Sequence, residues 1–113
     1  MTYRSKASIG EEGMKFDDDK LQIYQGFTSY FPQAISSVTK LSQFGAKKYA
    51  WGNWRHLDDA YHRYSDAMMR HHLLEDEVID KESGLLHITA VAWNAMARLE
   101  LFLTAEDKKD DKD

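Results

Sequence analysis

The 113 residues suffice for one small domain, and a composition of 42% hydrophobic and 30% charged residues excludes a disordered chain. A net charge of −4 argues against a general nucleic-acid binder, which needs a basic face, and the lack of cysteine excludes disulfides and thiolate metal sites. No apolar run approaches the ~20 residues that span a bilayer, and no signal peptide opens the chain. We therefore expect a cytoplasmic protein that does not contact membranes.

The single proline predicts where the first core helix begins. Pro32 suits a first helical turn because the N–H that it lacks would have no partner there. Apolar residues then recur at helical spacing, and Gly45 suits a C-cap, which predicts a helix over residues 32–44. A short helix within Leu21–Thr28 and a flexible segment at residues 1–14 are expected before it.

Two further helices are predicted on either side of an acidic segment. Asp58 or Asp59 can cap the first of these, whose apolar stripe from Leu57 to Leu74 includes His71. The second runs from about Lys81 or Ser83 to Leu103 and is apolar nearly all the way round, which is typical of a buried central helix.

These elements predict an all-α bundle with a four-helix core that oligomerisation completes. The domain is expected to cover residues 15–104. Residues 105–113 are rich in charge and are expected to form a disordered tail.

Polar side chains gather at one end of this bundle. His87 and Asn94 are two helical turns apart and share one face of the last helix, while His71 lies on the core face of the helix before it. The acidic segment, with Glu77, Asp80 and Glu82, joins those two helices, so chain geometry brings it toward both histidines. Carboxylates grouped with imidazoles can hold a divalent cation that contacts phosphate oxygens.

Each of these residues also has a plainer explanation. A histidine on an apolar face is more often a hydrogen-bonded core residue, and an acidic loop between helices is more often solvated. Asp80 could simply cap the last helix, and Asn94 could fix its packing. A metal site is favoured because all these polar residues are predicted to lie at the same end of the bundle.

Several short motifs occur along the chain in a recognisable order. They are Gly13–Asp17, Phe44–Tyr49 with Asn53 and Trp54, Arg70 with His71, and Asp80–Gly84 with His87 and Asn94. In this order and spacing, from about Gly13 to Leu103, they resemble the phage dATP/dGTP diphosphohydrolases, a MazG-like family.

This resemblance implies an all-α pyrophosphohydrolase that splits dATP or dGTP into the monophosphate and pyrophosphate, with Mg²⁺ or Mn²⁺ as cofactor. The implied catalytic residues are Asp80, Glu82 and His87, and the implied metal ligands are these three with Glu77. The implied substrate contacts are Lys48, Asn53, Trp54, Arg70, His71 and Asn94. The implied partners are a purine deoxynucleoside triphosphate and further copies of the chain, as a homodimer or homotetramer, and the implied role is to shape deoxynucleotide pools during phage infection.

One position departs from the broader MazG-like pattern. His87 stands where the last acidic residue of that pattern is expected, two turns before Asn94. Because Mg²⁺ prefers an all-oxygen shell and imidazole suits Mn²⁺ and heavier ions, either the metal preference has shifted or the histidines orient water and phosphate.

Two alternatives remain open. One is another metal phosphohydrolase, such as an HD-type nucleotidase, although the chain has no His-Asp dipeptide. The other is a catalytically silent bundle that binds a nucleotide or a host protein.

Overall fold

The computed structural model describes residues 20–111, with side chains described as far as residue 108. In chain order its elements are η2 (Tyr24–Thr28), α2 (Pro32–Lys48), η3 (Asn53–His56), α3 (Ala60–Leu73), η4 (Glu75–Glu77) and α4 (His87–Asp111). The only β-type pairing within these described residues is an isolated bridge between Ile79 and Leu86. The predicted all-α class is confirmed.

The chain divides into two compact units within α2, between Ile35 and Ser36. In the described part of the first unit, η2 is a π-helical turn, which places a short helix where one is predicted. Phe31 packs edge-on against Phe27 and Tyr30, with ring centroids 6.0 and 5.8 Å apart. The predicted flexible N-terminus at residues 1–14 and the motif at 13–17 lie outside the described residues.

Helix α2 begins at Pro32, as predicted, but Gly45 does not end it. The Tyr49 N–H donates to the Gly45 carbonyl over 3.0 Å, so the helical pattern runs through the glycine. The chain turns away only after Lys48, at Ala50 (φ 130°) and Gly52 (φ 79°), where positive φ values reverse its direction. Gly45 keeps an ordinary helical conformation, so the predicted C-cap is wrong.

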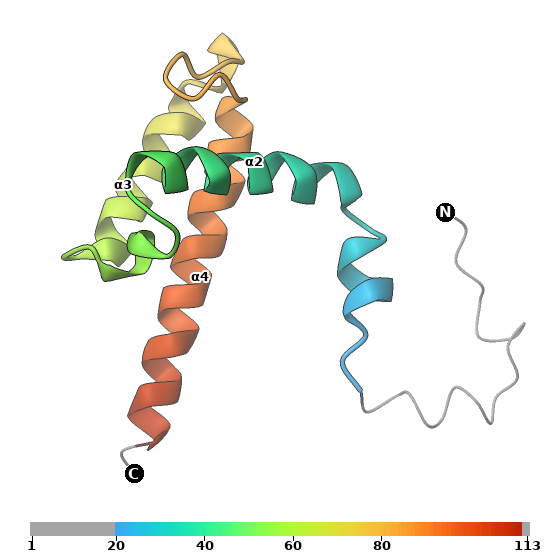
Figure 1. The fold of residues 1–113 in the computed structure, drawn as a ribbon, viewed down its shortest axis with the longest axis vertical. Coiled ribbons are helices and arrows are strands. Elements are labelled where there is room, and N and C mark those ends of the chain that lie inside the picture. The colour runs from blue at the N-terminus through green and yellow to red at the C-terminus, as the bar shows by residue number, and fades with distance from the viewer. Residues whose placement is uncertain (1–19, 112–113) are drawn as a thin grey trace, which may run out of the picture. The chain divides into compact units, whose positions relative to one another are not determined.

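Helices α3 and α4 lie side by side and run in opposite directions, joined by the segment that contains η4 (Figure 1). Asp59 stands at the N-terminus of α3, as the capping prediction requires, but its side chain makes no cap hydrogen bond. It adopts a left-handed conformation, and its carboxylate lies 2.8 Å from His62 Nδ1 instead. The predicted capping contact is therefore wrong, although the helix starts where expected.

Helix α4 starts later and ends later than predicted. It begins at His87, because residues 80–86 form a hairpin loop that the sequence assigns to the helix. Asp80 therefore does not cap it. The helix continues to Asp111, into the segment 105–113 that the charge pattern predicts to be a disordered tail.

The core of the second unit is thin. Its buried apolar residues are the small Ala60, Ala90 and Ala97, and no large side chain in the described part of the chain is fully enclosed. Large side chains on α4 stay open, with Ile88 56% and Met96 51% exposed, so the prediction that this helix is buried all round is wrong for the single chain. No helix in the described part is both long and apolar enough to cross a bilayer.

Three buried polar residues sit on α4 among these alanines: His87, Thr89 and Asn94, each 4–5% exposed. The Thr89 hydroxyl lies 2.6 Å from the Ser37 hydroxyl of α2, and one turn further the indole N–H of Trp93 donates to Ser42 Oγ over 2.9 Å. These contacts tie the second-unit part of α2 to α4. Three of the five buried residues on the described part of α4 are therefore polar, and each of them has a hydrogen-bond partner.

Candidate functional site: a histidine–aspartate cluster at the end of an aromatic pocket

A short hairpin between η4 and α4 places Asp80 beside the start of α4. The Asp80 N–H donates to the Leu85 carbonyl over 2.7 Å, and the His87 N–H donates to the Val78 carbonyl over 2.8 Å. Gly84, at φ 76°, donates to the Asp80 carbonyl and closes the turn, a conformation that glycine adopts without strain. Local backbone geometry therefore brings Asp80 and His87 together.

Val78 reaches this hairpin in a strained conformation. Its φ of 66° and ψ of −64° are unfavourable for a β-branched residue. Such strain persists only where surrounding contacts impose it, here the Val78–His87 hydrogen bond and the Ile79–Leu86 bridge. These contacts thus hold the loop next to Asp80 and His87 in a conformation that costs free energy.

His71, Asp80 and His87 form a group that could hold a metal ion. Each offers one ligand atom, and these atoms lie within 4.8 Å of one another. The three residues come from α3, the hairpin and the start of α4, so the antiparallel packing of the two helices creates the group. Two imidazoles and one carboxylate suit Mn²⁺ or a heavier divalent ion better than Mg²⁺, which prefers oxygen alone.

The surroundings keep His71 and Asp80 in the protonation state that a cation needs. Burial lowers the pKa of His71 from its ordinary value of 6.5, with smaller effects from nearby charges, so the ring is neutral at pH 7. Burial alone would raise the pKa of Asp80, but hydrogen bonds from the Ser83 hydroxyl and from the Ser83 and Glu82 N–H groups outweigh it, and the pKa falls below 3.8. The carboxylate is therefore anionic, and the His71 imidazole has a lone pair to offer.

A pocket of about 580 Å³ opens beside the group, within the range of small-molecule sites. Its polar side chains include His71, Asp80, Glu82 and Ser83 beside the start of α4, and Ser42, Asn53, Arg63 and Asn94 elsewhere on the wall. The volume and the combination of charged and aromatic side chains suit a ligand with a charged part and a flat apolar part.

Aromatic rings form much of the remaining wall. Trp54, Tyr64 and Trp93 pack edge-on against one another, with ring centroids 5.5–6.1 Å apart. The Tyr64 hydroxyl donates to the Trp54 carbonyl over 2.6 Å, and the Trp93 indole is bound to Ser42, so these two polar groups are already occupied. Tyr64 and Trp93 therefore offer the pocket mainly ring surface, and burial raises the pKa of Tyr64 above 10.0.

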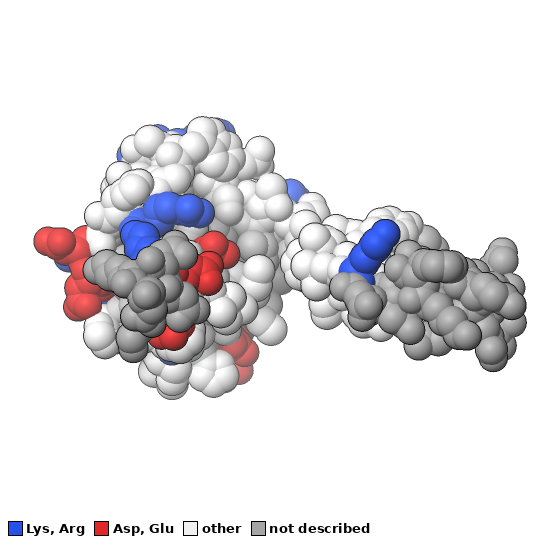
Figure 2. Space-filling model, turned by 90° about the horizontal axis from the view of Figure 1, so that it is seen from below, with Lys and Arg blue, Asp and Glu red and all other residues white. Residues whose placement is uncertain are grey.

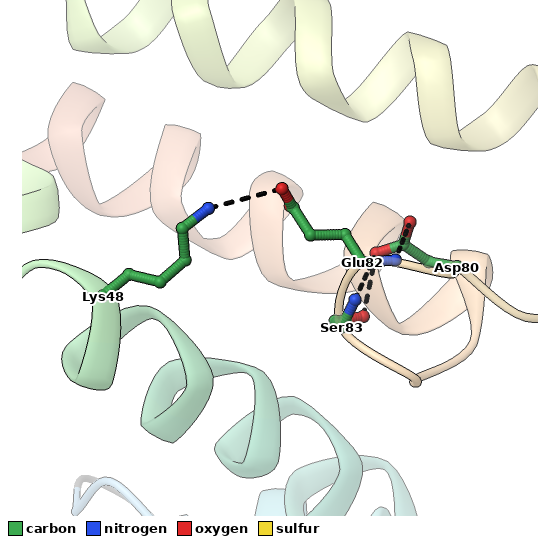
Figure 3. A network of polar contacts seen from close by, with 4 residues as sticks. All are labelled: Lys48, Asp80, Glu82 and Ser83. Carbon is green, nitrogen blue, oxygen red and sulfur yellow. Dashed lines mark hydrogen bonds and ion pairs between the residues drawn. The ribbon is translucent and has the colours of Figure 1, made fainter.

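An ion pair joins the end of α2 to the hairpin. Lys48 Nζ lies 3.4 Å from Glu82 Oε2 (Figure 3), and this hydrogen bond is the main reason why the pKa of Lys48 is raised. Both side chains are well exposed, which makes the pair weak and easily rearranged. Figure 3 also shows Asp80 turned toward Ser83 on the same hairpin, with the Ser83 hydroxyl donating over 2.8 Å.

The structure brings together most of the residues that the sequence predicts for the site. Asn53, Trp54, His71, Asp80, Glu82 and Asn94 line the pocket. His87 lies behind His71, with their Nδ1 atoms 2.9 Å apart, and Lys48 reaches Glu82. Glu77 and Arg70 are exposed and belong neither to the pocket wall nor to the histidine–aspartate group.

Several pocket residues were not among the predicted site residues, among them Arg63, Tyr64, Ser83 and Trp93. Tyr64 lies on the apolar stripe of its helix and was interpreted as core. Ser83 carries a recognisable signal, because a serine three residues after an aspartate commonly donates to it in a turn.

A match to a known protein family shows to which family the chain belongs. The family model described as "dATP/dGTP diphosphohydrolase, N-terminal" matches residues 10–112, nearly the whole chain. The chain belongs to this family. The suspected relationship is therefore confirmed, and the match covers every residue of the pocket and of the histidine–aspartate group. No match emerged among curated proteins or among solved structures.

Proposed function

We propose that this diphosphohydrolase-family chain is itself a metal-dependent hydrolase that converts dATP or dGTP to the monophosphate and pyrophosphate. The observation that carries the proposal is the position of the His71–Asp80–His87 group at the polar end of a pocket whose remaining wall is largely aromatic. The polar end matches a triphosphate, and the ring surfaces of Trp54 and Trp93 match a purine.

His71, Asp80 and His87 would hold the divalent cation, and its donor set favours Mn²⁺ over Mg²⁺. A cation there would neutralise charge on the phosphate oxygens. Asp80 is kept anionic by Ser83, and His71 is kept neutral by burial, so both residues are ready to act as ligands near pH 7.

Glu82 is our candidate for the general base. Glu82 lines the pocket, and its side chain extends from the hairpin toward Lys48, its one side-chain partner in the described structure, at 3.4 Å (Figure 3). A water oxygen would form a bond to the α-phosphorus while the bond from that phosphorus to the bridging oxygen breaks, and pyrophosphate leaves. Glu82 would take the proton of that water, and Lys48 would turn from Glu82 to the phosphates.

The other predicted substrate contacts fit less directly. Asn53 and Trp54 lie at the aromatic end, where they would contact the base or the sugar. Arg70 adjoins His71 in sequence but is exposed, so a phosphate contact would require its side chain to swing toward the pocket. Glu77 would likewise have to move to join the metal ligands, and we regard both as weaker candidates.

Further copies of the chain are the expected partners. Leu99, Phe102 and Leu103 on α4 are 50–54% exposed, and the core of a single chain lacks large enclosed side chains. Figure 2 shows that uncharged atoms cover most of the described surface seen from the end where α4 finishes. Association through α4 as a homodimer or homotetramer would bury these residues.

Product analysis tests the proposed reaction. The protein would be incubated with dATP, dGTP and the corresponding ribonucleotides, each with Mn²⁺ or Mg²⁺, and the products separated by ion-exchange chromatography. We expect equal amounts of deoxynucleoside monophosphate and pyrophosphate. Release of inorganic phosphate, of triphosphate or of free nucleoside would refute the reaction, and binding without turnover with either metal would favour the silent binding protein.

A further inference from the structure

The side-chain amide of Asn94 has a fixed orientation. Its Nδ2 donates to the Ala90 carbonyl one turn earlier on α4, over 2.7 Å. A backbone carbonyl is only an acceptor, so the amide nitrogen must face it and the amide oxygen must face away. Asn94 is 5% exposed, which leaves its side chain little freedom to rotate.

The oxygen of this amide is not sealed inside the core. In the described part of the chain, no hydrogen bond other than the one to Ala90 involves the Asn94 side chain, and no enclosed side-chain oxygen or nitrogen lacks a partner. The Oδ1 atom therefore keeps some exposed surface. Since Asn94 lines the pocket, we expect this surface to face the space that a ligand would occupy.

Asn94 lies at the right distance from the histidine–aspartate group to contact the nucleoside part of a nucleotide. It follows His87 by two helical turns, or about 10 Å along the axis of α4. Ala90, also on the pocket wall, lies between them and leaves room for a ligand because its side chain is small. With the phosphates at His71 and Asp80, the sugar and the base would extend toward Asn94 and Trp93.

We infer that Asn94 Oδ1 is a fixed hydrogen-bond acceptor that selects a donor group on the nucleoside part of the ligand. This inference rests on the proposed function. Phosphate oxygens are mostly deprotonated near neutral pH and then act only as acceptors, so they are poor partners for a fixed acceptor. A purine deoxynucleotide offers two kinds of donor there, the sugar 3′-hydroxyl and the ring or amino N–H groups of the base.

The test compares substrates that lack one donor each. Values of kcat/KM would be measured for dATP, for 2′,3′-dideoxyadenosine triphosphate, which lacks the hydroxyl, and for purine 2′-deoxyriboside triphosphate, which lacks the amino group. The wild-type protein should prefer dATP over one of these analogues by about tenfold, the size expected for one hydrogen bond. Asn94→Ala should bring that preference close to one, and the analogue affected identifies the donor.

A second variant and a matched control separate the loss of the acceptor from a general effect on the fold. Asn94→Leu keeps the number of side-chain heavy atoms and removes the acceptor without opening a cavity, so it serves if Asn94→Ala does not fold. Thr89→Val removes another buried polar group of α4, one that contacts Ser37 and does not line the pocket, and it should keep the wild-type preference.

Calorimetric titration with the product dAMP and its 3′-deoxy and 6-deamino counterparts gives a readout that does not depend on turnover. Preferences that survive in both Asn94 variants, alongside normal hydrolysis of dATP, would overturn this inference alone. A wild-type protein that neither hydrolyses dATP nor binds dAMP would overturn the proposed function, and this inference with it.

Discussion

The Nδ1 atoms of His71 and His87 lie 2.9 Å apart, across the contact between α3 and α4. Two ring nitrogens can share a hydrogen bond only if one carries a proton and the other does not. One of these two Nδ1 atoms therefore carries the shared proton and the other accepts it, so protonation of one ring at Nδ1 sets that of the other. His87 thus orients His71, whatever His71 itself binds.

Loss of Asp80 should abolish metal binding while the fold persists. Asp80→Asn removes the only negative charge of the His71–Asp80–His87 group but keeps the side-chain shape. We expect the heat of Mn²⁺ binding in calorimetry, and the rise in melting temperature on adding Mn²⁺, to disappear. Asp76→Asn, an exposed acid of the same segment, is the control and should bind Mn²⁺ normally. Unchanged Mn²⁺ affinity in Asp80→Asn would remove Asp80 from the ligand set.

Glu82→Gln should abolish turnover without changing the helical circular-dichroism signal. The substitution is nearly isosteric and removes the carboxylate to which we assign the proton of the attacking water. A general base contributes about 10²–10⁴-fold in rate, so kcat should fall by at least about a hundredfold. Single-turnover kinetics of dATP hydrolysis would measure it, and a Glu82→Gln protein as fast as wild type would show that another group accepts the proton.

The stability of the metal-free protein should fall in two steps on acidification. The pKa of His71 is lower in the folded state than its ordinary 6.5, so the unfolded chain binds protons more readily and stability decreases as the pH drops below about that value. The pKa of Asp80 is also lowered, so the stability that it provides is present above 3.8 and is lost as the pH falls through its folded value.

Thermal melts between pH 3 and pH 8 in the presence of a chelator would measure both steps. His71→Gln should lose the first step, while His56→Gln, a change at an exposed histidine of η3, should retain it. A melting temperature that rises on acidification from pH 7 to pH 5 would contradict the assigned direction.

Val78→Gly should stabilise the fold. Valine at a φ of 66° carries about 1–3 kcal/mol of backbone strain, whereas glycine adopts this conformation freely and loses about 0.5–1 kcal/mol through its more flexible unfolded state. The side chain is 54% exposed, so little apolar burial is lost. We expect a gain of about 1 kcal/mol in chemical denaturation. Val78→Ala keeps a side chain at positive φ and should gain less; equal gains would mean that strain is not the cause.

Phe102→Glu should weaken self-association. Phe102 is 54% exposed on α4, beside other exposed apolar residues, and a charge there would have to be buried in an interface. Size-exclusion chromatography with light scattering should show the wild-type chain as a dimer or tetramer and the variant at a smaller mass. Glu106→Gln alters the charge of the same helix without touching the apolar residues and should behave as wild type. A monomeric wild-type protein would contradict the prediction.

The sequence predicts helices well and their ends poorly. Pro32 marks a true start because proline restricts the backbone directly, whereas Gly45 permits a helix end without requiring one. The start of α4 was misplaced because residues 81–86 carry a helix-compatible pattern, and only the hydrogen bonds of Asp80 with Leu85 and Gly84 show that they form a hairpin. Turn hydrogen bonds of that kind do not appear as a periodic pattern in the sequence.

The site was predictable in part for the same reason. Two helices and the short connection between them bring together His71, Asp80 and His87. The order of these elements along the chain predicts this arrangement. Arg63 and Trp93 join the pocket through the packing of α2 and α3 on α4, and the sequence alone does not fix which face each helix turns inward. Glu77 and Glu82 lie in one acidic run, yet only Glu82 reaches the pocket, because the hairpin reverses between them.

The polar positions of α4 set a limit on how this protein can be made more robust. Replacing His87 or Asn94 by leucine would put apolar groups where the chain now encloses imidazole and amide, and would raise the melting temperature if the helices repack. The same replacements would remove the ring that orients His71 and the oxygen that faces the pocket. Substitutions that raise the melting temperature of this helix would therefore be expected to impair the site.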